Sequence, residues 1–223
     1  TITIGTMNNG AVYGDAQTAG SDCIGGGDEI IVTTMNGGVI YGDFETASAD
    51  AQYGEDVIRV ATMNGGTIYG DGKDGTASNA LAGDVIEIGA FNGGTIYTGM
   101  ATGGGVVYGS IVDTVEIQSI GGTGVKSIYG SEGQDTYIIG NNDLPSAVHT
   151  DGSVVTLYDF ETGDILDLTF FGNDVADAGL IDGSRRVTCT DDNNNSVTFV
   201  LDGVTASLAD LEAGMQILLN TGL

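Results

Sequence analysis

Aspartates recur at a fixed interval along the first half of this chain. They form two series in which neighbours are 28 residues apart: Asp28, Asp56 and Asp84, and Asp15, Asp43 and Asp71. If each interval is one turn of a stacked fold, each series is a column of like charges about 5 Å apart that repel by about 1 kcal/mol per pair even at high dielectric. Ca²⁺, which takes about six to eight oxygen ligands, would relieve that repulsion. The alternative is that these aspartates only begin strands and accept hydrogen bonds from turn amides.

The interval belongs to a sequence repeat. The phrase MNGGVIYGD begins at Met35 and returns as MNGGTIYGD at Met63, with MNNGAVYGD at Met7 and FNGGTIY at Phe91, each 28 residues on. A second half follows each phrase, as in GGGDEIIV, YGEDVIRV and AGDVIEI, and IVDTVEI comes one residue late. Both halves alternate with the period of a strand, so each unit predicts two short strands joined by one short and one long turn.

Strands this short cannot bury a face unless the units stack. Stacking gives each strand two parallel neighbours and a continuous Ile/Val core, which is the arrangement of a solenoid. We therefore predict an all-β fold: a parallel β-roll or β-solenoid of about five 28-residue coils followed by a β-rich C-terminal cap. An antiparallel meander is the alternative, but it has no need of a fixed register. Tyr13, Tyr41, Tyr69 and Tyr97 would form a stacked ladder, or else a carbohydrate-binding strip.

The glycine–aspartate–aliphatic halves resemble the haemolysin-type calcium-binding (RTX) nonapeptide GGxGxDxUx, where U is a large aliphatic residue. GEDVI from Gly54 and GGDEI from Gly26 match its GxDxU portion, and GSEGQDTYI (Gly130–Ile138) matches it best, with Gly133 and Asp135 at the expected offsets. The resemblance implies a parallel β-roll with Ca²⁺ bound between coils. It implies metal ligands at Asp15, Asp28, Asp43, Asp56, Asp71, Asp84, Asp113 and Asp135.

The second part of the chain is similar to the end of many RTX proteins. TLYDFETGDILDLT (Thr156–Thr169) resembles the acidic segment after the last repeat, and Val197–Leu218 resembles the close of a tail that carries a type I secretion signal. The expected organisation is a β-roll at 1–140, a linker at 141–153 and a capping and secretion-signal domain at 154–223. The short turn departs from the family, because glycine stands where its aspartate would be, so calcium is expected on the long-turn side.

Composition narrows the function classes. The net charge is -26, from 31 acidic and 5 basic residues, which disfavours nucleic acid and anionic membranes as partners. No apolar run reaches the length of a membrane span. Cys23 and Cys189 are far apart, and separate thiols are expected rather than a disulfide or a zinc site. No catalytic motif is present, and the only histidine, His149, is expected to be exposed in the linker, so the chain is predicted not to be an enzyme.

Three functions remain open. The first is a secreted bacterial module that folds on Ca²⁺ outside the cell and is exported by type I secretion machinery. The second is an S-layer or adhesin-type surface protein in which the stack itself makes contacts, through self-association or with cell-surface polysaccharide. The third is an accessory module of a secreted polysaccharide-modifying enzyme or protease, because one module can serve many parents. All three place the chain outside the cell or at its surface.

Overall fold

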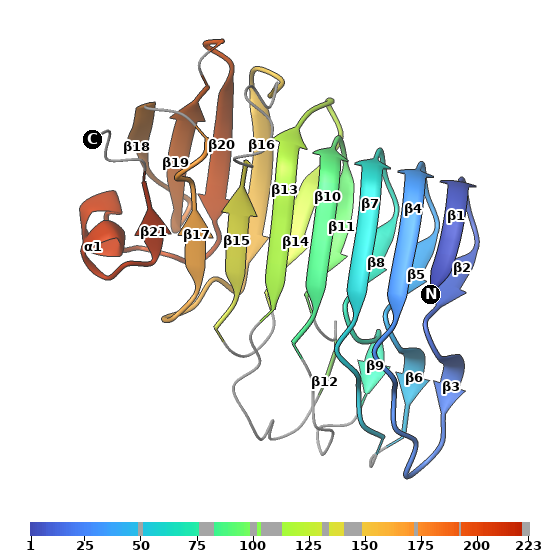
Figure 1. Cartoon of the computed structure of the whole chain (residues 1–223). Coiled ribbons are helices and arrows are strands. Elements are labelled where there is room, and N and C mark those ends of the chain that lie inside the picture. Colours follow the sequence, from blue (N-terminus) through green and yellow to red (C-terminus); the bar gives the residue numbers. More distant parts are fainter. Residues whose placement is uncertain are drawn as a thin grey trace.

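A computed structural model of the chain describes residues 1–48, 51–75, 83–98, 102–103, 113–130, 134–140, 149–171, 174–191 and 193–219. In this structure the chain winds into a β-solenoid of about five turns, as the repeat predicts. Successive coils stack side by side from β1 at one end to the C-terminal elements at the other (Figure 1). The predicted fold class is confirmed.

Eight strands form the first sheet. In spatial order they are β1 (Ile2–Met7), β4 (Glu29–Met35), β7 (Val57–Met63), β10 (Val85–Phe91), β13 (Thr114–Ile120), β15 (Thr136–Ile139), β17 (Ile165–Asp167) and β21 (Ile217–Leu218). All pairs in this sheet are parallel, and the register follows the repeat: Ile30 pairs with Ile58 and Ile58 with Ile86. The side chains of these three isoleucines are fully buried. Equivalent residues of successive coils therefore stack directly on one another.

Nine strands form the second sheet on the opposite side of the core. In spatial order they are β18 (Asp174–Ile181), β19 (Ser184–Thr190), β20 (Ser196–Leu201), β16 (Ser153–Tyr158), β14 (Lys126–Tyr129), β11 (Gly94–Tyr97), β8 (Thr67–Tyr69), β5 (Val39–Tyr41) and β2 (Ala11–Tyr13). The pairs from β2 to β20 are parallel, while β18–β19 and β19–β20 are antiparallel. Strands of the predicted cap thus extend both sheets of the solenoid, and the sheets are continuous across residue 154.

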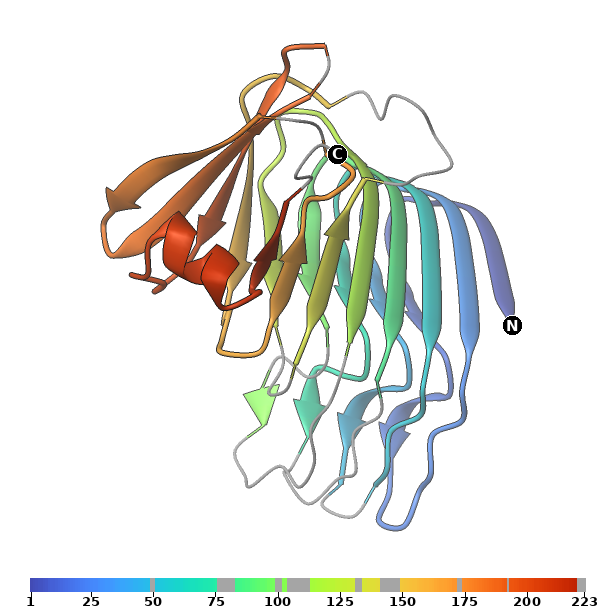
Figure 2. The same cartoon turned by 60° about the vertical axis from the view of Figure 1, so that its left-hand side comes forward.

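The long turns contain a third sheet that the sequence did not reveal. Its strands are β12 (Thr102–Gly103), β9 (Asp74–Gly75), β6 (Phe44–Ala47) and β3 (Ala16–Ala19), which project below the two main sheets (Figure 2). A separate small core of Ala19, Phe44, Ala51 and Tyr53 includes residues of β3 and β6. In the first two coils the described parts of the long turns therefore pack on one another through apolar residues.

The short turns depend on glycine. Gly38, Gly66 and Gly94 have φ angles of 96°, 101° and 126°, which L side chains rarely adopt. A Cβ on Gly66 would also lie 2.5 Å from the terminal methyl of Met35 in the preceding coil. Both facts explain why the repeat keeps glycine where the resemblance would place aspartate. A column of Met7, Met35, Met63 and Phe91 fills the core beside these turns.

The C-terminal elements close one end of the solenoid. Helix α1 (Leu208–Ala213) has a capping box between Ser207 and Asp210 and buries Leu208 and Leu211. Within the described residues no helix is long and apolar enough to cross a membrane. Cys189 is buried in the main core and Cys23 lies against the small core, and both thiols are free, as expected.

The prediction that His149 is exposed is wrong. Its side chain is buried and stacks on Phe171 with ring centroids 4.1 Å apart. Its Nδ1 accepts a hydrogen bond from the Ile120 backbone N–H, and the backbone N–H of His149 donates to Asp191 Oδ2. The sequence around His149 is polar, which predicts an exposed loop. The aromatic stack and these two hydrogen bonds instead hold His149 between the last coils and the cap.

Candidate metal centre

Six aspartates form a continuous row along the start of the first-sheet strands, and all of them except the half-buried Asp28 are buried. Each backbone N–H donates to Oδ1 of the next aspartate, at 2.6 Å for Asp28 to Asp56 and 2.8 Å for Asp56 to Asp84. The chain continues through Asp113 and Asp135 and ends at Asp164. One carboxylate oxygen per coil is thereby used to hold the register.

The second oxygen of the carboxylates of Asp56 and Asp84, in the middle of this row, lacks a hydrogen bond to any described residue. Oδ2 of Asp56 and Oδ2 of Asp84 are buried and have no hydrogen-bond partner among the described residues. At the far end of the row, Asp164 is satisfied, because its Oδ2 accepts the Glu161 N–H at 2.7 Å. A buried carboxylate oxygen without a partner costs free energy, so the middle of the row is where a proton or a cation would be most stabilising.

The other series follows the second-sheet strands and faces the same turn. Oδ2 of Asp15 accepts the Gly26 N–H, and Oδ2 of Asp43 accepts the Gly54 N–H, each at 2.8 Å. Oδ1 of Asp43 and both oxygens of Asp71 are buried without a partner among the described residues. Asp15, in the first coil, is exposed. This row therefore resembles the first: Asp15 and Asp43 each have one bonded oxygen, whereas buried oxygens of Asp43 and Asp71 are left without a partner among the described residues.

Glycines bring backbone carbonyls against these carboxylates. A Cβ on Gly42 would lie 1.7 Å from the Gly70 carbonyl oxygen and 2.3 Å from Asp56 Oδ2. A Cβ on Gly70 would lie 1.8 Å from the Thr98 carbonyl oxygen and 2.3 Å from Asp84 Oδ2. Only glycine fits such positions, and each one holds a carbonyl oxygen and a partnerless carboxylate oxygen against the same point of the turn.

The carboxylates resist ionisation in this arrangement. Burial, then the nearby Asp56 carboxylate, raises the pKa of Asp43 to about 9, and burial raises the pKa of Asp56 to about 7. Burial and neighbouring carboxylates raise the pKa values of Asp71 and Asp84 well above the ordinary value of 3.8. Without a cation these inner aspartates would hold protons at pH values where exposed aspartates are ionised.

The structure brings the predicted residues together as two rows, with one addition. Asp113 and Asp135, from the less regular coils, lie in the first row with their partners. Asp164 also belongs there, and the sequence indicates it only through Gly163–Asp164–Ile165, which repeats Gly83–Asp84–Val85. Gly99, which interrupts the second series, and Gly133 of the best nonapeptide match lie outside the described residues.

Within the part of the chain that the structure describes, no group of three or more His, Cys, Asp or Glu side chains converges as a ready metal centre. The local donors are instead carboxylate oxygens in pairs, supplemented by backbone carbonyls. Such a set is all hard oxygen, which suits Ca²⁺ or Mg²⁺ and does not suit the softer metals that prefer sulfur or imidazole.

On the opposite, short-turn side, uncharged asparagine side chains form a hydrogen-bonded ladder. Asn36 Nδ2 donates to Asn8 Oδ1, Asn64 to Asn36 and Asn92 to Asn64, each at 2.8 Å. An amide is both donor and acceptor, so this column satisfies itself. The predicted tyrosine ladder is also present and longer than expected, running from Tyr13 to Tyr158 with centroid spacings of 5.2 to 4.4 Å.

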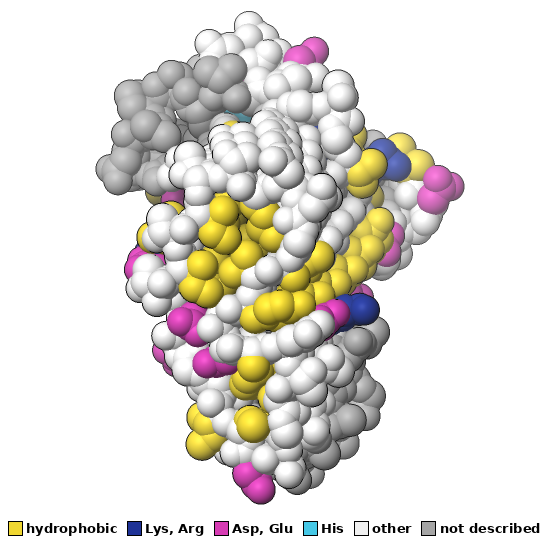
Figure 3. Space-filling view, turned by 90° about the vertical axis from the view of Figure 1, so that its right-hand side faces the viewer, with side chains coloured by type: hydrophobic (Ala, Val, Ile, Leu, Met, Phe, Trp, Pro, Cys, Tyr) yellow, Lys and Arg dark blue, Asp and Glu magenta, His cyan; other side chains and the backbone are white. Residues whose placement is uncertain are grey.

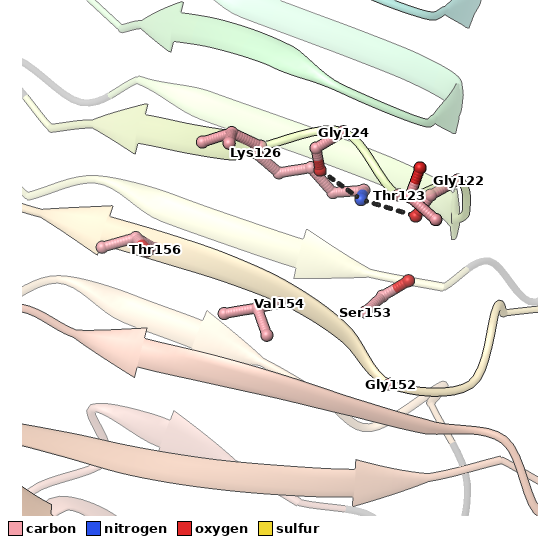
Figure 4. A pocket seen from close by; sticks show the side chains of 9 residues that line it. Gly122, Thr123, Gly124, Lys126, Gly152, Ser153, Val154 and Thr156 are labelled. Atoms are coloured by element: carbon pink, nitrogen blue, oxygen red, sulfur yellow. Dashed lines mark hydrogen bonds between the residues drawn. The ribbon is translucent and has the colours of Figure 1, made fainter.

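A cavity of about 290 Å³ opens beside Lys126 (Figure 4). Lys126 pairs in register with Gly94, and its Nζ donates to the carbonyl oxygens of Gly122 and Gly124 at 3.2 and 3.0 Å. Burial lowers the pKa of this ammonium group. The side chain thus ties together the short turn around Gly122 and Gly124, which departs from the repeat, and its ammonium group has a structural role there.

No family model, no curated protein and no solved structure matches this chain. The fold and the two aspartate rows define it as a β-solenoid repeat protein whose inner coils bury aspartates on the long-turn side.

Proposed function

We propose that this chain is a calcium-binding module that completes its fold when Ca²⁺ enters the two aspartate rows. The observation that carries the proposal is the set of buried carboxylate oxygens without a partner, on Asp43, Asp56, Asp71 and Asp84. Asp71 lies in the second row, and its side chain is fully buried. Charged groups so placed need either protons or cations.

The donors present fit a hard divalent ion. Carboxylates of Asp43, Asp56, Asp71 and Asp84 would hold it, with carbonyl oxygens of Gly70 and Thr98 beside them. The ion would supply positive charge that neutralises carboxylates of adjacent coils. Calcium is favoured over magnesium because irregular sets of carboxylate and carbonyl oxygens suit its flexible coordination, whereas magnesium requires near-ideal octahedral geometry.

Ligand linkage connects this site to secretion. An ion that binds only the folded chain stabilises it in proportion to the logarithm of its concentration. In cytosol poor in calcium the acidic chain would remain exportable, and outside the cell calcium would fold it. The resemblance of Val197–Leu218 to type I secretion tails supports this proposal, and we assign no catalytic role. Export of the full chain into the medium only when a type I exporter is co-expressed would test it.

Thermal unfolding followed by circular dichroism tests the calcium proposal. The metal-stripped full chain is measured at pH 8 with CaCl₂, with MgCl₂ at the same ionic strength, and without divalent ions. We expect a cooperative β-sheet transition at the highest temperature in Ca²⁺, a lower one in Mg²⁺ and the lowest without either. Equal signals and equal melting temperatures in all three would overturn the proposal, and equal effects of both ions would show only charge screening.

A further inference from the structure

Lys126 is a buried cation without an acidic partner. The chain has only 5 basic residues, and in the end view of Figure 3 few of them are visible among acidic and apolar side chains. Arg59 and Arg185 form ion pairs with carboxylates. Lys126 is 2% exposed and forms no ion pair with a described residue, although the chain has 31 acidic residues. Because a buried charge is costly unless it is paired, this ammonium group lacks a counter-ion.

The ammonium group of Lys126 still has hydrogen-bonding capacity. An ammonium group has three N–H donors, and Nζ uses two of them on the carbonyl oxygens of Gly122 and Gly124. Burial lowers the pKa of Lys126, and no carboxylate counteracts that shift. An anion beside Nζ would accept the third N–H and would favour the charged form of the side chain.

A second unsatisfied group lines the same cavity. Ser153, the first residue of β16, is 5% exposed, and its Oγ is buried without a hydrogen-bond partner among the described residues. Figure 4 shows its hydroxyl directed from β16 toward the turn that holds Lys126 Nζ. The backbone N–H groups of Thr123 and Gly124, which also line the cavity, donate to no other described residue. The cavity therefore gathers one positive charge and several unused hydrogen-bond donors.

We propose that this cavity binds a small oxyanion, such as sulfate or a carboxylate group, as the counter-ion of Lys126. The oxygens of the anion would accept hydrogen bonds from Nζ and from the Ser153 hydroxyl, and bonds of this charge-assisted kind are the stronger ones. Water would satisfy the serine but would leave the ammonium charge unpaired, and a cation would be repelled by it. The cavity contains none of the row aspartates, so the proposal is independent of the calcium proposal.

Nuclear magnetic resonance of the isotope-labelled full chain tests the site. Sodium sulfate and sodium acetate are titrated separately, and sodium chloride of equal ionic strength is the control for screening. The titrations are made under conditions where circular dichroism shows a folded chain. We expect saturable shifts of the backbone amide signals of Thr123 and Gly124 with sulfate, with acetate or with both, and none with chloride. The ion that binds more tightly shows whether the site prefers a tetrahedral or a planar acid group.

Two variants separate an anion site from a purely structural contact. Lys126→Met removes the ammonium group but keeps an apolar side chain, and we expect the saturable shifts to disappear. Ser153→Ala removes a hydroxyl without a partner, so it should leave the melting temperature in chloride unchanged and weaken anion binding severalfold. Lys73→Met, which removes an exposed lysine on the long-turn side, is the matched control and should bind the anion as the original chain does.

A folded chain whose Thr123 and Gly124 signals show no saturable shift with either oxyanion overturns the proposal. Equal binding by the original chain, Lys126→Met and Ser153→Ala overturns it as well, because the ligand would then be an adventitious ion only. If Lys126→Met does not fold, the comparison of Ser153→Ala with the original chain decides. Loss of the fold without Ca²⁺ would affect only the proposed function, because anion binding is measured on folded chain.

Discussion

The two turn sides of the solenoid solve the same stacking problem with different chemistry. On the short-turn side, asparagines stack in register and each amide donates to the next, so the column is neutral and complete. On the long-turn side, aspartates stack in register, but a carboxylate can only accept. Among the described residues, backbone N–H groups satisfy one oxygen each of Asp84 and Asp43 and neither oxygen of Asp71. The comparison shows that a self-complementary side chain stacks unaided, whereas a column of carboxylates leaves unused oxygens that call for cations or protons.

The largest expected effect comes from adding a side chain at Gly42, where a backbone carbonyl of the next coil leaves no room for a Cβ. Gly42→Ala places a Cβ 1.7 Å from the Gly70 carbonyl oxygen, so the coils must separate. We expect a loss of at least about 3 kcal/mol in unfolding free energy, with and without calcium. Urea unfolding measures it. Gly26→Ala is the control, since its nearest neighbour would be 4.0 Å away, and equal stability of the two variants would contradict the described packing.

Removing carboxylates from the second row should lower the stability of the chain in Ca²⁺ and raise it in calcium-free buffer. Asp43→Asn/Asp71→Asn removes two buried carboxylates. In Ca²⁺ we expect a loss of about 2–4 kcal/mol, or roughly 5–15 °C in melting temperature, because ligands are lost. Without divalent ions we expect a gain of about 1–4 kcal/mol, because the variant no longer has to bury two carboxyl groups that must take up protons on folding.

The matched control for that variant is Asp22→Asn/Asp182→Asn, which removes the same net charge from two exposed positions. It should shift the melting temperature by little in either buffer. A loss of stability for Asp43→Asn/Asp71→Asn that is the same in both buffers would mean that these carboxylates act without an ion.

The pH dependence of the calcium-free chain should also identify the long-turn side. The folded pKa values of Asp56 and Asp43 lie at about 7 and about 9, above the ordinary 3.8. The folded chain therefore binds more protons than the unfolded chain between these values. This stabilisation is fully present below pH 3.8 and is lost as the pH rises through 7 and 9. Melting temperatures that do not fall over this range would contradict the placement of these side chains.

The contribution of His149, at the junction with the cap, to stability should depend on pH in the opposite sense. Burial lowers the pKa of its imidazole below the ordinary 6.5, so its contribution is present above pH 6.5 and is lost as the pH falls through the folded pKa. In saturating calcium, stability should decline in mild acid. His149→Gln should be less stable near neutrality by about 1–3 kcal/mol and should lose part of that decline. An unchanged acid profile would contradict the role of His149.

The smallest effect is expected on the short-turn side. Asn64→Ala removes hydrogen bonds to Asn36 and Asn92 at a partly solvated site. The expected cost is about 1 kcal/mol, equal in calcium and in calcium-free buffer, because no ion is involved there. A cost that depends on calcium would break the distinction between the two sides.

The repeat made the solenoid, its parallel register and the short-turn glycines predictable, because a fixed interval states directly which residues stack. Asp113 was predictable from IVDTVEI, which follows the repeat one residue late, and Asp135 from the likeness of GSEGQDTYI to the nonapeptide. The small core around Phe44 and Tyr53 could not be predicted, since it depends on pairing between turns of differing sequence. The same holds for His149, whose burial depends on Phe171 and Asp191, far along the chain.

Calcium titration of the metal-stripped full chain by isothermal calorimetry at pH 8 tests the central claim most directly. The account predicts saturable binding of more than one ion per chain, with fewer ions bound by Asp43→Asn/Asp71→Asn and an unchanged number bound by Asp22→Asn/Asp182→Asn. The absence of saturable binding at millimolar calcium, or the same stoichiometry in all three chains, would contradict it.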